Sequence, residues 1–361
     1  MDFTTLQIVW FCLIAVLWTG YLVLEGFDYG VAMLIPILGK TEKEKRVIIN
    51  TIGPVWDGNE VWLLTAGGAM FAAFPAWYAT LFSGLYLPLF FVLVGLIVRG
   101  VAFEYRSKHP EMSAKRTFDA MASIGSFVVS LIFGVAFANF MIGLPVAARP
   151  PATAEATTTL FMLSPAPYLL QLFSPFAILG GIVLVVLFLF HGAIYLVLKT
   201  RGIVQERAKR FAAVIGLVAI VGGAVFLLWQ NLAIHPTGWL GWVLLVVAAA
   251  GLVAAWWFVG RGERPGVAFL GTTVTTLCVA VGVFLTMWPN LGFANAPGAE
   301  HVLNAATAAS QDSTLTIMLV AAIIFVPIVV AYTAWTYWVF RRPISVDNIP
   351  DEDHHEAAHA G

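Results

Sequence analysis

The amino-acid sequence predicts an all-α protein that crosses a membrane nine times. Charged residues make up only 11% of the 361 residues, and the mean hydropathy is +0.89, whereas soluble domains carry roughly 25% charged residues. Nine apolar runs are each long enough to cross a hydrocarbon core of about 30 Å. In lipid these runs must be helical, because an isolated strand would leave its backbone groups unpaired.

The apolar runs follow one another along the whole chain, so residues 1–361 are interpreted as a single integral membrane domain. The first run lacks a basic start and is too long for a cleaved leader, so we expect it to remain in the mature protein. Two of the connections, 145–168 and 289–314, are expected to be irregular surface segments. The predicted helices lie near 8–38, 47–72, 78–102, 118–144, 169–198, 211–230, 239–260, 266–288 and 315–340.

Basic residues set the expected orientation. Of the 19 Lys and Arg residues, 17 lie in five alternate connections, counting the C-terminal segment, and the other connections hold only Arg149. Cytoplasmic loops carry such an excess of Lys and Arg. The N-terminus is therefore predicted outside and the C-terminus in the cytoplasm. Residues 343–361 are expected to form a disordered cytoplasmic tail, although their acids and histidines offer weak metal ligands.

Four acids lie within the first two predicted helices. Glu25 and Asp28 belong to the first, and Asp57 and Glu60 to the second, with i, i+3 spacing in each pair, so each pair shares a helix face. A carboxylate near the bilayer centre costs a few kcal/mol or more and persists mainly where it faces protein, water or a partner. These residues are the candidate functional groups.

The two pairs are expected at the same depth. Asp28 lies 11 residues before Gly39, and Asp57 lies 11 residues after Arg46, which places both roughly 16 Å into the membrane. Helices joined by a short loop pack as an antiparallel hairpin, so the four carboxylates are predicted to converge near mid-membrane. Carboxylates that close in a low dielectric cannot all be ionised, and Pro54 loosens the helix just before Asp57.

Two interpretations of the acids stay open. The first is a proton path from the cytoplasm. The second is a purely structural role, in which the acids bond to Trp56, Asn59, Tyr29 or a neighbouring subunit. Arg99 and Glu104, near the inner end of the third predicted helix, are interpreted as an interfacial pair with snorkelling side chains, not as part of the chemistry.

Several kinds of site have no support in the sequence. Haem needs axial His, Met or Cys ligands, and the lone histidine within a predicted span, His191, is interpreted as hydrogen-bonded to a neighbour. Cys12 and Cys278 stand alone in apolar runs and are read as core residues. The net charge is -1 and the pI near 6.7, which argues against a nucleic-acid partner. No nucleotide-binding or nucleophile motif is present.

Four segments resemble subunit II of cytochrome bd-type ubiquinol or menaquinol oxidases, and the second is the most specific. They are Gly26-Phe27-Asp28-Tyr29-Gly30, Trp56-Asp57-Gly58-Asn59-Glu60-Val61-Trp62, Arg106-Ser107-Lys108 and Tyr332-Thr333-Ala334-Trp335-Thr336-Tyr337-Trp338.

This resemblance implies a multi-pass protein of the bacterial cytoplasmic membrane, built as two four-helix bundles plus one additional helix. Its partner is subunit I, which holds haems b558, b595 and d in a pseudosymmetric heterodimer. The complex oxidises quinol near the outer face, reduces O2 to water with cytoplasmic protons, and is electrogenic. By the same resemblance, this chain binds no haem and has no turnover alone; a structural quinone, membrane lipids and small accessory subunits are further possible partners.

The resemblance also assigns roles to individual acids. Asp57 matches the acid that the family's second subunit supplies to a proton channel along the subunit interface, and Asp28 matches the family's other acid. Glu60 occupies a position that is Gln in some relatives, which argues against an essential role. The alternatives are a proton-coupled secondary transporter, compatible with helices interrupted by Gly and Pro, and a purely structural assembly subunit.

Overall fold

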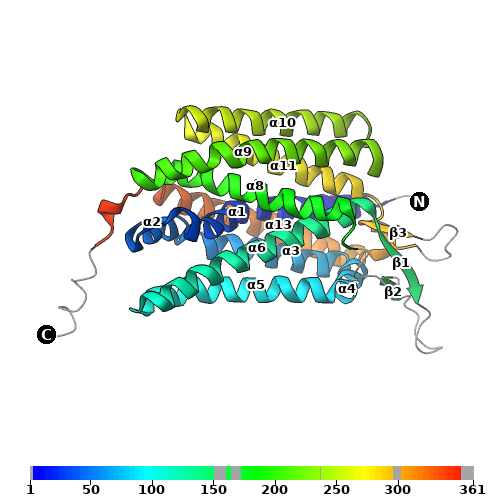
Figure 1. Ribbon diagram of the computed structural model, residues 1–361. Helices are drawn as coiled ribbons and strands as arrows, with labels where there is room; N and C mark the ends of the chain where they lie inside the picture. Colours follow the sequence, from blue (N-terminus) through cyan, green and yellow to red (C-terminus); the bar gives the residue numbers. More distant parts are fainter. Residues whose placement is uncertain (1–2, 150–159, 164–171, 236, 296–301, 351–361) are drawn as a thin grey trace.

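The computed structural model describes residues 3–149, 160–163, 172–235, 237–295 and 302–350, which are mostly helical (Figure 1). The first half contains α1 (Thr5–Leu38), α2 (Glu42–Ile52), α3 (Trp56–Ala73), α4 (Pro75–Gly84), α5 (Tyr86–Tyr105), the 3-10 turn η1 (Arg106–Lys108), α6 (Met112–Ile142), β1 (Leu144–Arg149) and β2 (Leu160–Leu163). The second half contains α8 (Pro175–Lys199), α9 (Ile203–Trp229), the π-helical turn η2 (Gln230–Ile234), α10 (Gly238–Arg261), α11 (Pro265–Met287), β3 (Phe293–Asn295), α12 (Ala305–Ala308), α13 (Asp312–Val339) and the 3-10 turn η3 (Val346–Asn348).

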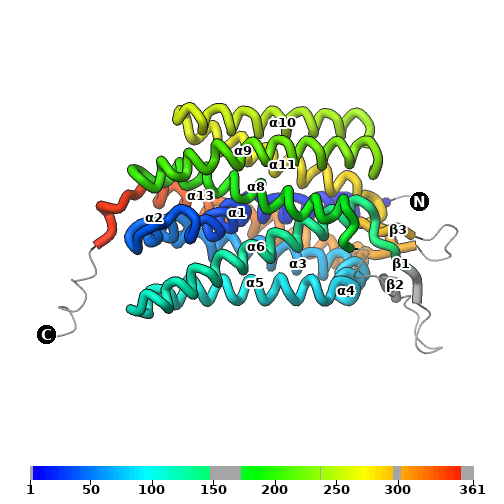
Figure 2. The backbone as a smooth tube through the Cα atoms, viewed as in Figure 1, coloured from blue at the N-terminus to red at the C-terminus, as the bar shows by residue number. Residues whose placement is uncertain are grey.

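Within these residues, eight helices are long and apolar enough to cross a membrane, and a ninth span is counted if α3 and α4, bent by 119°, form one. The predicted mostly helical, multi-span class is thereby confirmed. The long helices run side by side, with α2 and the C-terminal segment at one end and the N-terminus and strands at the other (Figure 2). We call these the α2 end and the sheet end.

The second predicted span is broken between residues 53 and 55. Pro54 has no N–H to continue the helical hydrogen bonds, and the Val55 N–H bonds to the Ile52 carbonyl at 2.9 Å. The Thr51 carbonyl therefore does not accept the helical hydrogen bond from the Val55 N–H. The Tyr195 hydroxyl of α8 donates to it instead, at 3.1 Å. The chain turns again at Pro75, the first residue of α4, so α5 begins later than the predicted third span.

Helix α8 lies at the centre and packs against α1, α6 and α9, while α10 packs against α9 and α11. Where α1 crosses α8, a Cβ added at Gly192 would come within 2.5 Å of the Gly30 carbonyl carbon, so this close approach requires glycine. Helix α13 packs against α1 and α3, and Leu315 is its one buried residue.

A small sheet forms at the sheet end, where the connections were expected to be irregular. Its strand order is β2-β1-β3; β1 pairs antiparallel with β2, with Val146 opposite Leu163, and parallel with β3, with Val146 opposite Asn295. Strand pairing satisfies the backbone N–H and C=O groups of these segments. The sheet is a local addition to the predicted all-α fold.

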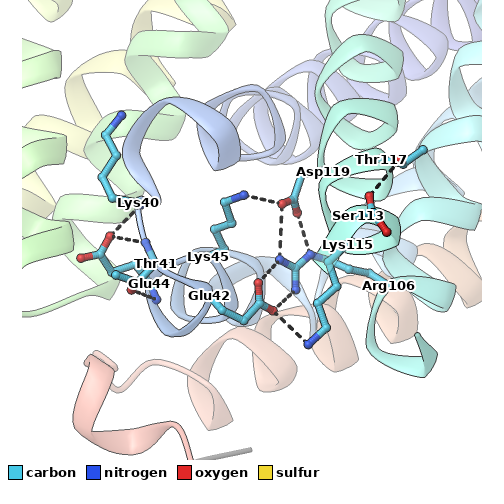
Figure 3. A network of polar contacts seen from close by, with 10 residues as sticks. All are labelled: Lys40, Thr41, Glu42, Glu44, Lys45, Arg106, Ser113, Lys115, Thr117 and Asp119. Carbon is cyan, nitrogen blue, oxygen red and sulfur yellow. Dashed lines mark hydrogen bonds and ion pairs between the residues drawn. The ribbon is translucent and has the colours of Figure 1, made fainter. Parts of the chain in front are cut away.

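An ionic network at the α2 end fixes α2 to its neighbours (Figure 3). The Arg106 guanidinium contacts Glu42 through two nitrogens, at 2.7 and 2.9 Å, and Asp119 of α6 through Nε at 2.6 Å. Lys45 of α2 also reaches Asp119, at 2.7 Å. Bidentate Arg–carboxylate pairs add geometric specificity, so this network fixes where the chain enters the break before α3.

Glu44 provides a second attachment, between α2 and α9. Its Oε2 accepts from the backbone N–H of Lys40 at 2.7 Å and from the Arg207 guanidinium at 2.6 Å. Partial burial acts to raise the pKa of this carboxyl, but the N–H groups of Lys40 and Thr41 and the Arg207 guanidinium outweigh it and hold the pKa below its usual value.

The chain after α13 returns to the α2 end of α8. Ile344 forms a parallel bridge with Thr200, the Lys199 ammonium donates to the Phe340 carbonyl, and Arg46 donates to the Pro350 carbonyl at 3.3 Å. Residues 343–350 of the predicted tail are therefore packed against the helices. The remainder of that tail, 351–361, lies outside the described residues.

Candidate functional site

A fully buried arginine joins two of the predicted acids. Arg99 of α5 has no exposed side-chain surface, and its Nη1 lies 2.5 Å from Oε1 of Glu25 and 2.5 Å from Oε1 of Glu60. The expectation that Arg99 snorkels beside Glu104 is wrong, because Arg99 is fully buried and pairs with Glu25 and Glu60. Arg99 lies six residues before the end of α5, about 9 Å, and the nearby carboxylates retain it inside the protein.

Aromatic rings complete the surroundings of Arg99. Its guanidinium carbon lies 4.8 Å from the ring centroid of Tyr29, 5.2 Å from that of Phe103 and 5.7 Å from that of Trp56. Aromatic faces attract a cation within about 6 Å. The Arg99 charge is therefore stabilised by carboxylates and by rings from α1, α3 and α5.

Asp28 is linked to α3 and α13 by hydrogen bonds. Asn59 Nδ2 donates to Asp28 Oδ2 at 2.6 Å, and the Tyr337 hydroxyl donates to Asn59 Oδ1 at 2.9 Å. Asp28 has no exposed surface and Asn59 almost none. Neither Asn59 nor Tyr337 was singled out as functional, although both belong to motifs that carry the family resemblance.

The structure separates Asp57 from the other three acids. Asp57 is exposed near the start of α3, whereas Glu25 and Asp28 are fully buried and the Glu60 side chain is 24% exposed. Residues three apart on a helix differ in direction by about 60°, so Glu60 reaches Arg99 while Asp57 faces outward. The structure thus brings Glu25 and Glu60 together on Arg99, holds Asp28 against Asn59, and leaves Asp57 at the surface.

Several atoms of this site are buried without a hydrogen bond from the described residues: both oxygens of Glu25, Oδ1 of Asp28, and Nε and Nη2 of Arg99. Glu25 Oε1 is close enough to Arg99 for an ion pair but not aligned for a hydrogen bond. Native structures contain few such groups, and each calls for an explanation.

His191 has both ring nitrogens engaged, as expected for a histidine bonded to its neighbours. Nδ1 lies 2.7 Å from Thr272 Oγ1, and Nε2 lies 3.2 Å from the Val23 carbonyl oxygen. The carbonyl can only accept, so Nε2 carries a proton and Nδ1 is left to accept from the Thr272 hydroxyl, which also lies 3.0 Å from the Phe269 carbonyl oxygen. Neither nitrogen is left for a haem iron, and the described residues contain no cluster of three or more metal-ligand side chains.

A large apolar cavity lies between α3, α4, α5 and α6, toward the sheet end. Its volume is about 640 Å³, and its lining includes Phe71, Trp77, Tyr86 and Phe133. The Trp77 indole N–H is buried without a hydrogen-bond partner among the described residues. The cavity walls are predominantly apolar.

Comparison with known proteins decides the family. The model of "cytochrome bd terminal oxidase subunit II" matches residues 6–340. The chain belongs to this family. It is 36% identical to cytochrome bd ubiquinol oxidase subunit 2 of Bacillus subtilis, over 94% of this chain and 97% of that one. It is 33% identical to cytochrome bd-I ubiquinol oxidase subunit 2 of Escherichia coli, over 98% and 99% of the two chains.

The fold agrees with this membership. A solved structure of the bd oxidase from Geobacillus thermodenitrificans matches with a TM-score of 0.72 at 16% sequence identity, over 93% of this chain and 99% of that one. The family resemblance predicted from the four segments is confirmed. The chain is a subunit of a cytochrome bd quinol oxidase, an oxidoreductase complex of the respiratory chain, and a multi-pass protein of the bacterial inner membrane. Membership implies subunit I as partner, with the haems in that subunit.

Proposed function

We propose that this subunit II carries protons from the cytoplasm toward the oxygen-reducing site of the complex and stabilises the haem-bearing subunit I. The observation that supports the proton role is the buried group formed by Glu25, Glu60 and Arg99, with Asp28 one helical turn from Glu25. Three acids and one cation give two excess negative charges if all are ionised. Inside a membrane that excess favours taking up protons.

The α2 end is assigned to the cytoplasm. It carries the basic connection before α3, the Arg106 network and the basic segment after α13, and Lys- and Arg-rich connections remain on the cytoplasmic side. Protons then enter from the side of the break before α3. We also propose that the chain forms two four-helix bundles, with α13 as the additional helix.

Asp57 is assigned to the surface that subunit I covers. Helix α13 is exposed along nearly its whole length, and it contacts α3, where Asp57 also faces outward. An exposed carboxylate beside apolar helices in lipid requires water or a partner. Asp57 thus lies where a proton passes along the interface, and the partly exposed Glu60 connects it with the buried acids.

The deciding experiment is Asp57→Asn in the purified, assembled complex. We expect the reduced-minus-oxidised haem spectrum to be retained and quinol-driven oxygen consumption to fall at least tenfold, since positioned proton-transfer groups contribute about 10²–10⁴-fold. Asp312→Asn, at the exposed start of α13, is the matched control and should leave turnover unchanged. Full turnover in a haem-loaded Asp57→Asn complex would favour the purely structural subunit.

We further propose that the cavity beside α4 holds a quinone as a structural element. Its predominantly apolar walls fit an isoprenoid tail. Extraction of the gently purified complex should release quinone that complexes with the cavity-filling substitution Gly67→Phe lack, because Gly67 lines the cavity and an added Cβ meets open space, while the haem content stays unchanged. Equal quinone in both complexes would contradict this assignment.

A further inference from the structure

We propose that Asn59 and Tyr337 are positioning residues that fix Oδ1 as the atom of Asp28 which takes up and releases a proton. The inference rests on the proposed proton role of the acid group. In it, Asn59 and Tyr337 determine which oxygen of the Asp28 carboxyl carries the proton.

The Asn59 amide has one orientation that satisfies all its contacts. Nδ2 donates to Asp28 Oδ2 at 2.6 Å and approaches the Leu24 carbonyl oxygen at 3.3 Å, while Oδ1 accepts from the Tyr337 hydroxyl at 2.9 Å. A flipped amide would place its oxygen against the Leu24 carbonyl, which can only accept. Asn59 is therefore held as a donor toward Asp28.

A fixed donor distinguishes the two oxygens of Asp28. A proton on Oδ2 would make that oxygen the hydroxyl of the acid, which is a weaker acceptor than the carbonyl oxygen, and would weaken the hydrogen bond from Asn59. A proton on Oδ1 leaves Oδ2 as the carbonyl oxygen, which still accepts from Asn59. Oδ1 is buried and has no hydrogen bond from the described residues. Protonation at Oδ1 therefore preserves the hydrogen bonds that join Asp28, Asn59 and Tyr337.

The Asp28 carboxyl can exchange its proton with the Glu25 carboxyl, one helical turn away on the same helix. Glu25 lies three residues before Asp28 on α1, and both its oxygens lack hydrogen bonds from the described residues. The exchange leaves the total charge of the two carboxyls unchanged, because the proton that leaves one carboxylic acid forms the other. Asp28 then cycles between carboxylate and acid while Oδ2 stays bonded to Asn59.

Tyr337 has a natural control in Tyr195. Both tyrosine rings pack on Phe27, with centroids 6.4 Å away for Tyr337 and 4.1 Å away for Tyr195. Their hydroxyls differ, because Tyr337 donates to Asn59 whereas Tyr195 donates to the Thr51 carbonyl. Removing each hydroxyl in turn separates the loss of Asn59 positioning from the loss of a buried hydroxyl near Asp28.

Other charged or titratable groups also influence Asp28, and each variant keeps all of them except the one side chain that it replaces. They come from all the helices packed around it: Glu25 on α1, Glu60 on α3, Arg99 on α5, Tyr195 on α8 and Tyr337 on α13.

The test is infrared difference spectroscopy of the purified complex between acidic and alkaline buffer. Asp28→Asn identifies the carbonyl stretching band of protonated Asp28 by its disappearance. If the proton is on Oδ1, the carbonyl oxygen accepts from Asn59, and Asn59→Leu should move the band to higher wavenumber. Tyr337→Phe should move it less in the same direction, and Tyr195→Phe should leave it in place.

Turnover provides the second readout. Asn59→Leu removes a hydrogen bond to a charged group, so we expect oxygen consumption about tenfold lower, with a smaller loss for Tyr337→Phe and an unchanged haem spectrum. A band that stays in place in both Asn59→Leu and Tyr337→Phe would overturn the assignment to Oδ1. If Asn59→Leu does not assemble, the conservative Tyr337→Phe decides by itself. Full turnover in Asp28→Asn would instead remove Asp28 from the proposed proton path.

Discussion

The acid-bearing helices α1, α3 and α5 differ from the helices α8–α11 in whether their buried polar atoms have hydrogen-bond partners. In α8–α11, His191 is bonded at both nitrogens, and Thr275 and Thr276 donate to carbonyl oxygens. In the acid-bearing helices, atoms of Glu25, Asp28 and Arg99 are buried without hydrogen bonds from the described residues. Satisfied polar groups stabilise packing, whereas unsatisfied charged groups in a membrane indicate function.

The largest effect that this comparison predicts is the loss of Arg99. Arg99→Met leaves the buried Glu25 and the partly exposed Glu60 without their cation, and breaking a buried pair costs about 3–5 kcal/mol. We expect little haem-loaded complex to be recovered, measured by the reduced-minus-oxidised spectrum per milligram of membrane protein. Arg264→Met, an exposed residue before α11, is the control. Normal yield and turnover in Arg99→Met would show that the acids do not need this charge.

The second prediction concerns the helices whose polar groups are satisfied. Thr272→Val removes the hydroxyl that donates to His191 Nδ1, and an unsatisfied buried group costs about 1–3 kcal/mol. The Tm of the complex should fall while turnover per haem stays normal. Thr273→Val, which loses only a bond to the Phe269 carbonyl in its own helix, should change Tm less. A selective loss of turnover in Thr272→Val would extend the functional region into α8 and α11.

The smallest predicted effect lies at the α2 end, outside both regions. Because the folded state holds the pKa of Glu44 below its usual value, its carboxylate stabilises the fold above the unfolded pKa of about 4.3. That contribution is lost as the pH falls through the lower folded pKa. Glu44→Gln should therefore be less stable than the parent near pH 7, by up to about 1 kcal/mol.

The measurement for Glu44 is Tm as a function of pH for both complexes. The difference should be constant near neutral pH and should narrow as the pH falls below about 4.3. Turnover should be unaffected at neutral pH. A difference that widens in acid would have the wrong sign for a carboxyl whose pKa is lowered by folding.

Hydropathy and the spacing of acids predicted much of this molecule, because lipid imposes helices and makes charges costly. The buried pairing of Arg99 was missed, because its position near a helix end fits snorkelling equally well. The direction of Asp57 depends on the rotation of α3 after the break at Pro54, and a three-residue spacing does not fix that rotation. The exposure of α13 also escaped prediction, because lipid-facing and protein-facing residues are both apolar.

The hydrogen bond from Tyr337 to Asn59 also bears on how the protein is made. The two residues are 278 positions apart in the chain, and the Trp10 indole of α1 similarly donates to the Leu315 carbonyl of α13 at 2.9 Å. Synthesis proceeds from the N-terminus, so α1 and α3 enter the membrane long before α13 exists. Asn59 consequently acquires its last partner only when translation is almost finished, and a chain truncated before α13 would insert its acids without completing their surroundings.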